Sequence, residues 1–339
     1  MITTDTTPTI ALLFPGQGSQ TVGMGRAFYD AYPAARAVFE EADDALGFSL
    51  SDIIFNGPED TLKLTEHTQP AILTVSIAAL RVLQHELQSH SLAIHYAAGH
   101  SLGEYSAHVA AGTFSFADAV RTVRARGQFM QAAVPPGPDG QAQGSMAAIL
   151  GLNLPDIEAA CQGVSAEQTY GVVTTANLNS PDQTVISGST AAVTRAAELC
   201  KELGAKRAVM LPVSAPFHCP LMMPAQLRLT DVLDRVPFHQ PRFPVASNVD
   251  AKLLMQPNDI RDALIRQVTG AVRWVDCIRE LQLSNVTHYI EVGPGKVLTG
   301  LNRQILKQAL ETETRTLNTT NVEDQPSLDK TLAALTGTA

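Results

Sequence analysis

The sequence predicts an α/β protein in which a parallel sheet covered by helices is interrupted by a small ferredoxin-like α+β domain. Short apolar runs alternate with helical patterns over the first 133 residues, the order expected of a parallel β/α fold. Residues 145–213 then follow the order strand, helix, two strands, helix, strand, which is typical of a ferredoxin-like unit. The chain of 339 residues is long enough for both parts.

The first part of the chain begins with "TIALLFPG", which predicts a buried strand that ends at Pro15 and Gly16. Helical patterns follow over residues 22–46 and 70–90. A strand is expected at 93–98, and helices continue to about residue 133.

The stretch "VPPGPDGQAQG", residues 134–144, interrupts this pattern with three prolines and three glycines. We therefore predict that an inserted domain spans 134–206, and that residues 1–133 and 207–339 form the larger domain. The insertion's expected elements are the strand "SMAAILGL", the helix "PDIEAACQG", the strands "GVVTTANL" and "QTVISGS", the helix "TAAVTRAAELCKELG" and the strand "KRAVMLPV".

The larger domain then resumes with a helix near 220–235, a strand "FPVASNV" and one helix across 258–283. A strand "THYIEVG", a Pro-Gly turn and a final helix complete the prediction. The sequence beyond about residue 310 is polar.

Composition excludes several classes of protein. The net charge of −9 and the lack of a basic run argue against a nucleic-acid partner. "MITTDTTPTI" does not resemble a signal peptide, and no apolar run approaches the roughly 20 residues that span a membrane. Four dispersed cysteines favour free thiols, and no cluster has metal-ligand spacing. We expect a cytoplasmic protein without a bound metal.

Ser101 is the first candidate for chemistry. It lies in Gly99-His100-Ser101-Leu102-Gly103, where an apolar run gives way to a helical pattern. Glycines two before and two after a serine allow a sharp strand-to-helix turn that exposes the hydroxyl. The Leu102 N–H is then a candidate oxyanion donor. The alternative is a chance match, since glycine and serine are common.

A nucleophilic serine needs a base. Among nine histidines, His218 is the best candidate because "SAPFHCPLM" fixes it between Pro216 and Pro220, late in the chain. A capping or packing histidine is the alternative. No acid stands out as a third member of a triad, although Asp182, Asp231 and Asp250 are available.

Arg126 interrupts an apolar helical stripe formed by Ala119, Val123 and Met130. A guanidinium on a buried face is costly unless an anion meets it. The anion is either a carboxylate of the protein or, near a serine–histidine pair, a carboxylate of the substrate.

"FPGQGSQ", residues 14–20, matches neither a dinucleotide-binding fingerprint nor a P-loop. The Gln17 N–H at the end of the first strand is a second candidate oxyanion donor. A plain tight turn is the alternative.

Eight segments in order resemble the malonyl-coenzyme A:acyl carrier protein transacylase family, from residue 11 to about 309. They are "FPGQGSQ", "GHSLGEYSA", "VRARGQFM", "ANLNSPDQTVISG", "SAPFHCPLM", "SNVDA", "IRQVTGAVRW" and "EVGPGKVLTGL".

The resemblance implies a hydrolase-like parallel-sheet domain with a ferredoxin-like insertion. It implies that Ser101 is the acylated nucleophile, His218 its base and Arg126 the clamp for the malonyl carboxylate. It adds two residues of the active site: the backbone carbonyl of Gln267 would orient the histidine in place of an acid, and Asn177 would line the site. Phe217 resembles the pattern associated with malonyl in preference to methylmalonyl groups.

The resemblance also implies a malonyl transfer from coenzyme A to acyl carrier protein through a serine ester, for fatty acid biosynthesis, without a cofactor. We expect a monomer, because nothing in the sequence demands an oligomer. A polyketide pathway, a thioesterase or esterase, and a non-catalytic carrier-binding module are the alternatives. An acidic carrier would need a local basic surface. The candidates are Lys201, Lys206, Arg207, Arg303 and Lys307.

Overall fold

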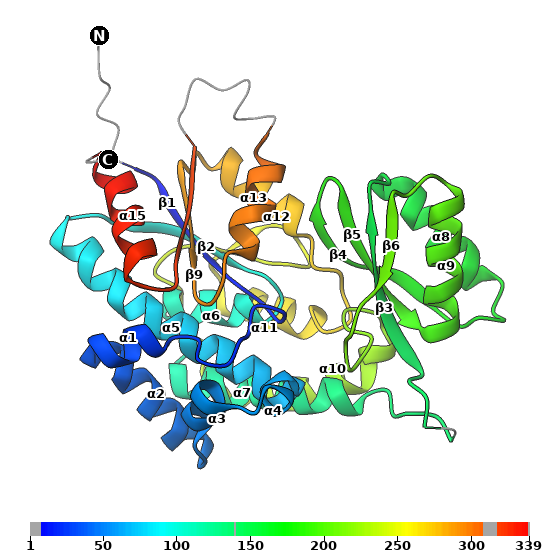
Figure 1. The fold of residues 1–339 in the computed structure, drawn as a ribbon, viewed down its shortest axis with the longest axis horizontal. Helices are drawn as coiled ribbons and strands as arrows, with labels where there is room; N and C mark the ends of the chain where they lie inside the picture. Colours follow the sequence, from blue (N-terminus) through cyan, green and yellow to red (C-terminus); the bar gives the residue numbers. More distant parts are fainter. Residues whose placement is uncertain (1–7, 139, 308–316, 338–339) are drawn as a thin grey trace, which may run out of the picture.

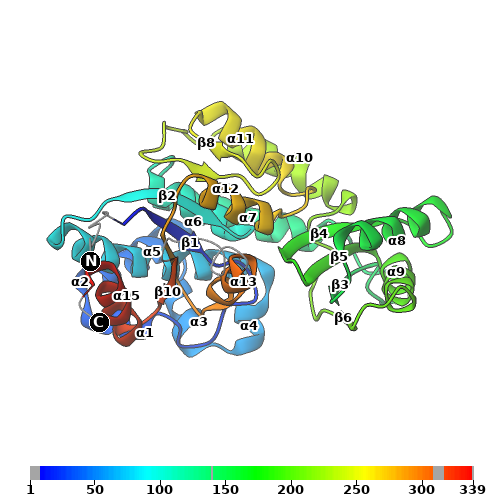
Figure 2. The same cartoon turned by 90° about the horizontal axis from the view of Figure 1, so that it is seen from above.

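The computed structural model describes residues 8–138, 140–307 and 317–337. The described residues form two sheets, one with six strands and one with four (Figure 1). Viewed at 90° to this, the four-stranded sheet and its helices lie to one side of the larger part (Figure 2).

The six-stranded sheet has the order β10-β9-β1-β2-β7-β8. All neighbouring pairs are parallel except β7 with β8, which is antiparallel. The predicted parallel sheet is therefore confirmed. Its strands are β1 (Ile10–Phe14), β2 (Ile94–Gly99), β7 (Val245–Ala246), β8 (Leu253–Leu254), β9 (His288–Val292) and β10 (Asn318–Val322).

Strand β1 explains why both faces of this sheet are covered. All five of its residues are buried. Ile10, Leu12 and Phe14 belong to one hydrophobic core, whereas Ala11 and Leu13 belong to another. Because side chains alternate between the faces of a strand, a continuous apolar run requires a packed layer on each side.

Helices supply these two layers. The first core includes residues of α2 (Pro33–Leu46), α5 (Thr65–Ser89) and α7 (Phe116–Ala132), and the second includes residues of α12 (Trp274–Leu283) and α13 (Val297–Ile305). The other helices that the described residues of this part form are α1 (Arg26–Ala31), α3 (Leu50–Asn56), α4 (Glu59–Lys63), α6 (Leu102–Ala111), a 3₁₀ turn η1 (Pro220–Met222), α10 (Met223–Leu233), α11 (Pro257–Arg266) and α15 (Gln325–Thr336).

Two predictions about this part were wrong. The single helix expected across 258–283 is two helices, α11 and α12, separated by residues 267–273. The helix after the Pro-Gly turn, α13, is not the last element, because β10 pairs with β9 in parallel and α15 follows it. The helix break was missed because the hydrophobic periodicity continues across residue 267. Strand β10 was missed because its residues are mostly polar and lack the apolar pattern of a strand.

The four-stranded sheet has the order β4-β5-β3-β6 and is antiparallel throughout. Its elements follow the predicted order: β3 (Gly144–Leu150), α8 (Leu154–Ala166), β4 (Val173–Ser180), β5 (Gln183–Ser189), α9 (Thr190–Glu202) and β6 (Arg207–Met210). Strand β6 begins at 207, so the sheet extends past the expected boundary at 206. The division of the chain into domains stays a prediction.

One face of this smaller sheet packs against helices, and the other lines a cavity. Ala147 and Ile149 of β3 pack in a core with α8 and α9. Met146 and Ala148, which alternate with them, line a cavity together with residues that follow β1 and β2. Ligand sites of parallel α/β sheets lie at the carboxyl ends of the strands, so the smaller sheet forms a wall of the region where a substrate is expected.

Candidate active site

The turn that carries Ser101 joins the end of β2 to the start of α6. Ser101 has a left-handed backbone, with φ 52° and ψ −105°, a conformation that is strained for a residue with a Cβ atom. A Cβ on Gly99 would lie 1.9 Å from the backbone of Gly103, and one on Gly103 would lie 2.0 Å from the Phe14 carbonyl oxygen. Both glycines are therefore required for the close approach of α6 to β1 and β2, and the predicted sharp turn is present.

Ser101 and His218 lie in hydrogen-bond contact, with Oγ 2.7 Å from Nε2. The His218 Nδ1–H donates to the backbone carbonyls of Gln267, at 2.9 Å, and Gly270, at 3.2 Å. Because a carbonyl only accepts, the proton of the neutral ring is on Nδ1, and Nε2 is left to accept the Ser101 proton.

The electrostatics of the pair keep His218 neutral. Burial and the nearby Arg126 cation lower its pKa to about 3. An unprotonated imidazole beside a serine hydroxyl is the state that a general base requires.

The break between α11 and α12 supplies the carbonyl groups that orient His218. Gln267 directly follows α11, and its carbonyl continues no helix. None of the three aspartates considered from the sequence bonds to His218: Asp250 pairs with Arg266 at 2.7 Å, Asp231 lies on α10, and Asp182 precedes β5. Among the described residues a carbonyl therefore takes the place of a triad acid, as the resemblance implied.

Arg126 points into the same site from α7. Its side chain is 2% exposed. Nη1 donates to Gln69 Oε1 at 2.8 Å, while Nη2 donates to Gln267 Oε1 at 2.9 Å and to Ser101 Oγ at 3.0 Å. Within the described ranges no Asp or Glu forms an ion pair with Arg126, and its Nε has no partner. The guanidinium is oriented by neutral oxygens, and its charge is free for an anion.

The two candidate oxyanion donors flank the nucleophile. Gln17 follows β1, and Leu102 is the first residue of α6. For the part of the chain that the structure describes, neither N–H donates to a backbone or side-chain acceptor. N–H groups at a helix start are aimed outward and favour negative charge.

A cavity of about 700 Å³ brings the candidates together. Its lining includes Gln17, Ser101, Arg126, Asn177, Phe217 and His218. Asn177 lies on β4, and Phe217 directly precedes the base. Leu102 and Gln267 lie next to lining residues without lining the cavity themselves. Every residue proposed from the sequence for catalysis or acyl binding is thus within one site or directly behind it, whereas the three candidate aspartates and the five basic docking candidates do not line the cavity.

Sequence reasoning missed three buried polar residues, each at most 1% exposed: Gln69, which lines the cavity, and Glu104 and Asn248, which lie behind it. Glu104 and Asn248 lie within quoted segments, "GHSLGEYSA" and "SNVDA". The available signal was that an acidic residue occupies an otherwise apolar and small-residue helix, where a buried carboxyl must find donors.

Two negative findings apply to the described residues only. They contain no group of three or more His, Cys, Asp and Glu side chains arranged to hold a metal ion. They also contain no helix with the length and apolar content needed to cross a membrane.

The fold and the site define a class of protein: a hydrolase-like α/β fold with a serine–histidine pair on a strained turn and an unpaired buried arginine beside it. The family model described as "Acyl transferase domain" matches residues 11–338. The chain belongs to this acyltransferase family, and the resemblance to the malonyl-coenzyme A:acyl carrier protein transacylases is confirmed.

Comparisons with individual relatives give the same family. The chain is 45% identical over 326 residues to the malonyl CoA-acyl carrier protein transacylase of Bacillus subtilis, covering 96% of this chain and 97% of that one. The structure of an acyl-carrier-protein S-malonyltransferase from Bartonella henselae is 44% identical, with a TM-score of 0.87 and coverage of 97% and 99%. A malonyl-transacylase in complex with its type II polyketide acyl-carrier protein is 42% identical, with the same TM-score and coverage. The family match extends to 338, so the expectation that the resemblance ends near 309 was too short.

Proposed function

We propose that this protein moves the malonyl group of malonyl-coenzyme A to the phosphopantetheine thiol of acyl carrier protein, through a malonyl ester on Ser101. The observation that carries the proposal is Arg126: a buried cation beside the nucleophile, with no carboxylate of the described chain paired to it. A substrate with both a thioester and a carboxylate offers a carbonyl carbon to Ser101 and an anion to Arg126. The names of the relatives support the same substrate.

In the first half-reaction, Ser101 Oγ attacks the thioester carbonyl carbon while its proton moves to His218 Nε2. The negative charge on the carbonyl oxygen is accepted by the N–H groups of Gln17 and Leu102. The carbon–sulfur bond then breaks, and the coenzyme A sulfur leaves with the proton from His218.

In the second half-reaction, the carrier thiol gives its proton to His218 and attacks the malonyl ester. The ester bond breaks, Ser101 Oγ recovers the proton, and the malonyl thioester of the carrier is released. Throughout, Arg126 pairs with the malonyl carboxylate, which fixes the reacting carbonyl near the oxyanion donors. The roles of Asn177 and Phe217 are to line the acyl cavity, Phe217 favouring malonyl over bulkier groups.

Fatty acid synthesis is the proposed pathway, as the resemblance to the transacylase family implies. A polyketide pathway is the second candidate, because one similar structure holds a polyketide carrier. The enzyme is proposed to act as a monomer in the cytoplasm, without a cofactor.

Carrier docking is proposed at five basic side chains, all exposed: Lys201, Lys206, Arg207, Arg303 and Lys307. Salt should weaken carrier binding at such a surface.

The test is intact-protein mass measurement after incubation with malonyl-, methylmalonyl- and acetyl-coenzyme A, followed by addition of water alone or of holo carrier. Malonyl labelling of Ser101 that persists in water and is discharged by the carrier thiol supports the proposal. Rapid discharge in water favours a thioesterase, and no labelling favours a non-catalytic binding module. A preference for a polyketide carrier over a fatty acid carrier favours the second pathway.

A further inference from the structure

Glu104 is a buried carboxyl group that the proposed mechanism does not use. It lies in the first turn of α6, three residues after Ser101, and is 1% exposed. Its Oε2 accepts two hydrogen bonds, from the backbone N–H of Asn248 at 3.1 Å and from Gln267 Nε2 at 2.7 Å. Burying a carboxyl group is costly, so its position next to the nucleophile requires a reason.

The first contact leads from Glu104 to the strained serine. Asn248 Oδ1 accepts from the Ser101 N–H at 2.7 Å, and Asn248 Nδ2 donates to the Gly99 carbonyl at 2.8 Å. Asn248 therefore holds the turn on both sides of His100, directly before the Ser101 side chain. Its own backbone N–H is fixed by Glu104.

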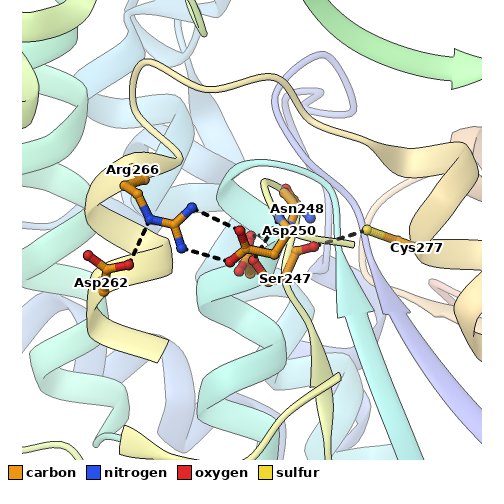
Figure 3. A network of polar contacts seen from close by, with 7 residues as sticks. Ser247, Asn248, Asp250, Asp262, Arg266 and Cys277 are labelled. Atoms are coloured by element: carbon orange, nitrogen blue, oxygen red, sulfur yellow. Dashed lines mark hydrogen bonds and ion pairs between the residues drawn. The ribbon is translucent and has the colours of Figure 1, made fainter. Parts of the chain in front are cut away.

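The loop that carries Asn248 is fixed from outside as well. Arg266 binds both carboxylate oxygens of Asp250, at 2.9 and 2.7 Å, and also pairs with Asp262 (Figure 3). On its other side, Cys277 Sγ contacts the Ser247 carbonyl. Asn248 is thus presented to the serine turn by a braced loop.

The second contact leads from Glu104 to Arg126. Gln267 Nε2 donates to Glu104 and to the Ser101 carbonyl, at 2.9 Å, which leaves Gln267 Oε1 to accept from Arg126 Nη2. An amide has one donating and one accepting end. Glu104 Oε2 and the Ser101 carbonyl both take the NH₂ group of Gln267, Glu104 at the shorter distance of 2.7 Å, so the oxygen of Gln267 faces the guanidinium.

We infer that Glu104 is a positioning residue for malonyl selectivity: it orients Gln267, and through it Arg126, while Asn248 holds the Ser101 turn. The inference rests on the proposed function. The atom of Glu104 that does this is Oε2, which accepts the hydrogen bonds from Gln267 and Asn248. Oε1 has no partner among the described residues, so a proton or an NH₂ group at that position leaves both hydrogen bonds intact.

Two substitutions separate the acceptor from the charge. Glu104→Gln keeps an oxygen at the Oε2 position, whereas Glu104→Leu removes it at similar volume. Val109→Ala is the matched control, because it removes buried apolar volume from the same helix without touching the polar network. Each variant is assayed by single-turnover labelling with malonyl- and acetyl-coenzyme A, and its folded fraction is measured by circular dichroism.

We expect Glu104→Gln to stay within about threefold of the wild type with both donors. Glu104→Leu should lose roughly 10- to 100-fold more malonyl than acetyl labelling, the effect of leaving buried donors without an acceptor. Val109→Ala should keep the wild-type ratio of malonyl to acetyl labelling. Gln267→Met removes the contact to Arg126 and the hydrogen bonds from Gln267 Nε2 to Glu104, the Ser101 carbonyl and Asn248 Oδ1, but it keeps the hydrogen bond from the Asn248 N–H to Glu104. It should lower the same ratio, and it is the second test if Glu104→Leu does not fold.

An unchanged malonyl-to-acetyl ratio in Glu104→Leu or in Gln267→Met overturns the inference. So does a Glu104→Gln variant as impaired as Glu104→Leu, because the charge would then be the agent. A wild type that forms no malonyl-enzyme overturns the proposed function instead, so the two failures are distinguishable.

Discussion

Replacing Arg126 by alanine removes the group that distinguishes a malonyl donor from an acetyl donor. The guanidinium is 2% exposed and is held by Gln69, Gln267 and Ser101. A substrate carboxylate that reaches it leaves water for a site in which, among the described residues, no Asp or Glu forms an ion pair with Arg126, the Glu104 carboxyl being separated from it by Gln267. Breaking a buried pair by removing one partner costs about 3 to 5 kcal/mol. At about 1.4 kcal/mol per factor of ten, malonyl labelling should fall roughly 10²- to 10⁴-fold.

Acetyl-coenzyme A provides the comparison, because it has the same thioester and no carboxylate. The assay follows single-turnover formation of malonyl- and acetyl-Ser101 by intact mass under saturating donor. The ratio of malonyl to acetyl labelling should collapse in Arg126→Ala. It should recover in part in Arg126→Lys, which restores charge without the planar fork.

Arg121→Ala is the control on the same helix, since Arg121 is 52% exposed and pairs with Asp118 at the surface. It should leave both labelling rates unchanged. The reasoning is refuted if Arg126→Ala loses malonyl and acetyl labelling by the same factor. Arg126 would then support Ser101 without recognising the carboxylate.

Three further outcomes follow from the geometry. Because burial first, and the Arg126 cation second, hold the pKa of His218 near 3, malonyl labelling should stay level from about pH 8 to about pH 5; a fall centred near 6.5 in a stopped-flow pH series would contradict this. Gly103→Ala places a Cβ 2.0 Å from the Phe14 carbonyl and should cost about 3 kcal/mol in urea unfolding, whereas Gly163→Ala, with nothing within 4 Å, should not destabilise. Burial raises the pKa of Glu104 from 4.5 to about 7, so the folded state binds the extra proton and its stability falls as pH rises through this window. Relative to Glu104→Gln, the wild type should lose up to about 3 kcal/mol in unfolding free energy between these pH values; a pH-independent difference would show that Glu104 does not titrate there.

Local sequence was sufficient for the elements that make the nucleophile. The strand before Ser101, the turn and the following helix are all encoded within "AAGHSLGEYSA", because side-chain periodicity and glycine positions act over a few residues. The order of elements in the four-stranded sheet was predictable for the same reason. The inward position of Arg126 followed from the apolar stripe around it.

Several features depended on long-range packing instead. The helix break at Gln267 has no clear local signal, yet it supplies the carbonyl that orients His218, 49 residues earlier. Strand β10 was missed because a polar edge strand is identified by its partner, β9, and not by its own pattern.

The sequence by itself determined which residue types are present for acyl transfer: a hydroxyl on a strained turn, an imidazole on a proline-bounded loop and a cation on an apolar helix face. Only the tertiary structure decided that the cation has no carboxylate partner among the described residues, and that Glu104 meets Gln267 across 163 positions of the chain. The physical reason is that burial and hydrogen-bond satisfaction are properties of a packed interior, in which each group's partner is set by how distant segments come together.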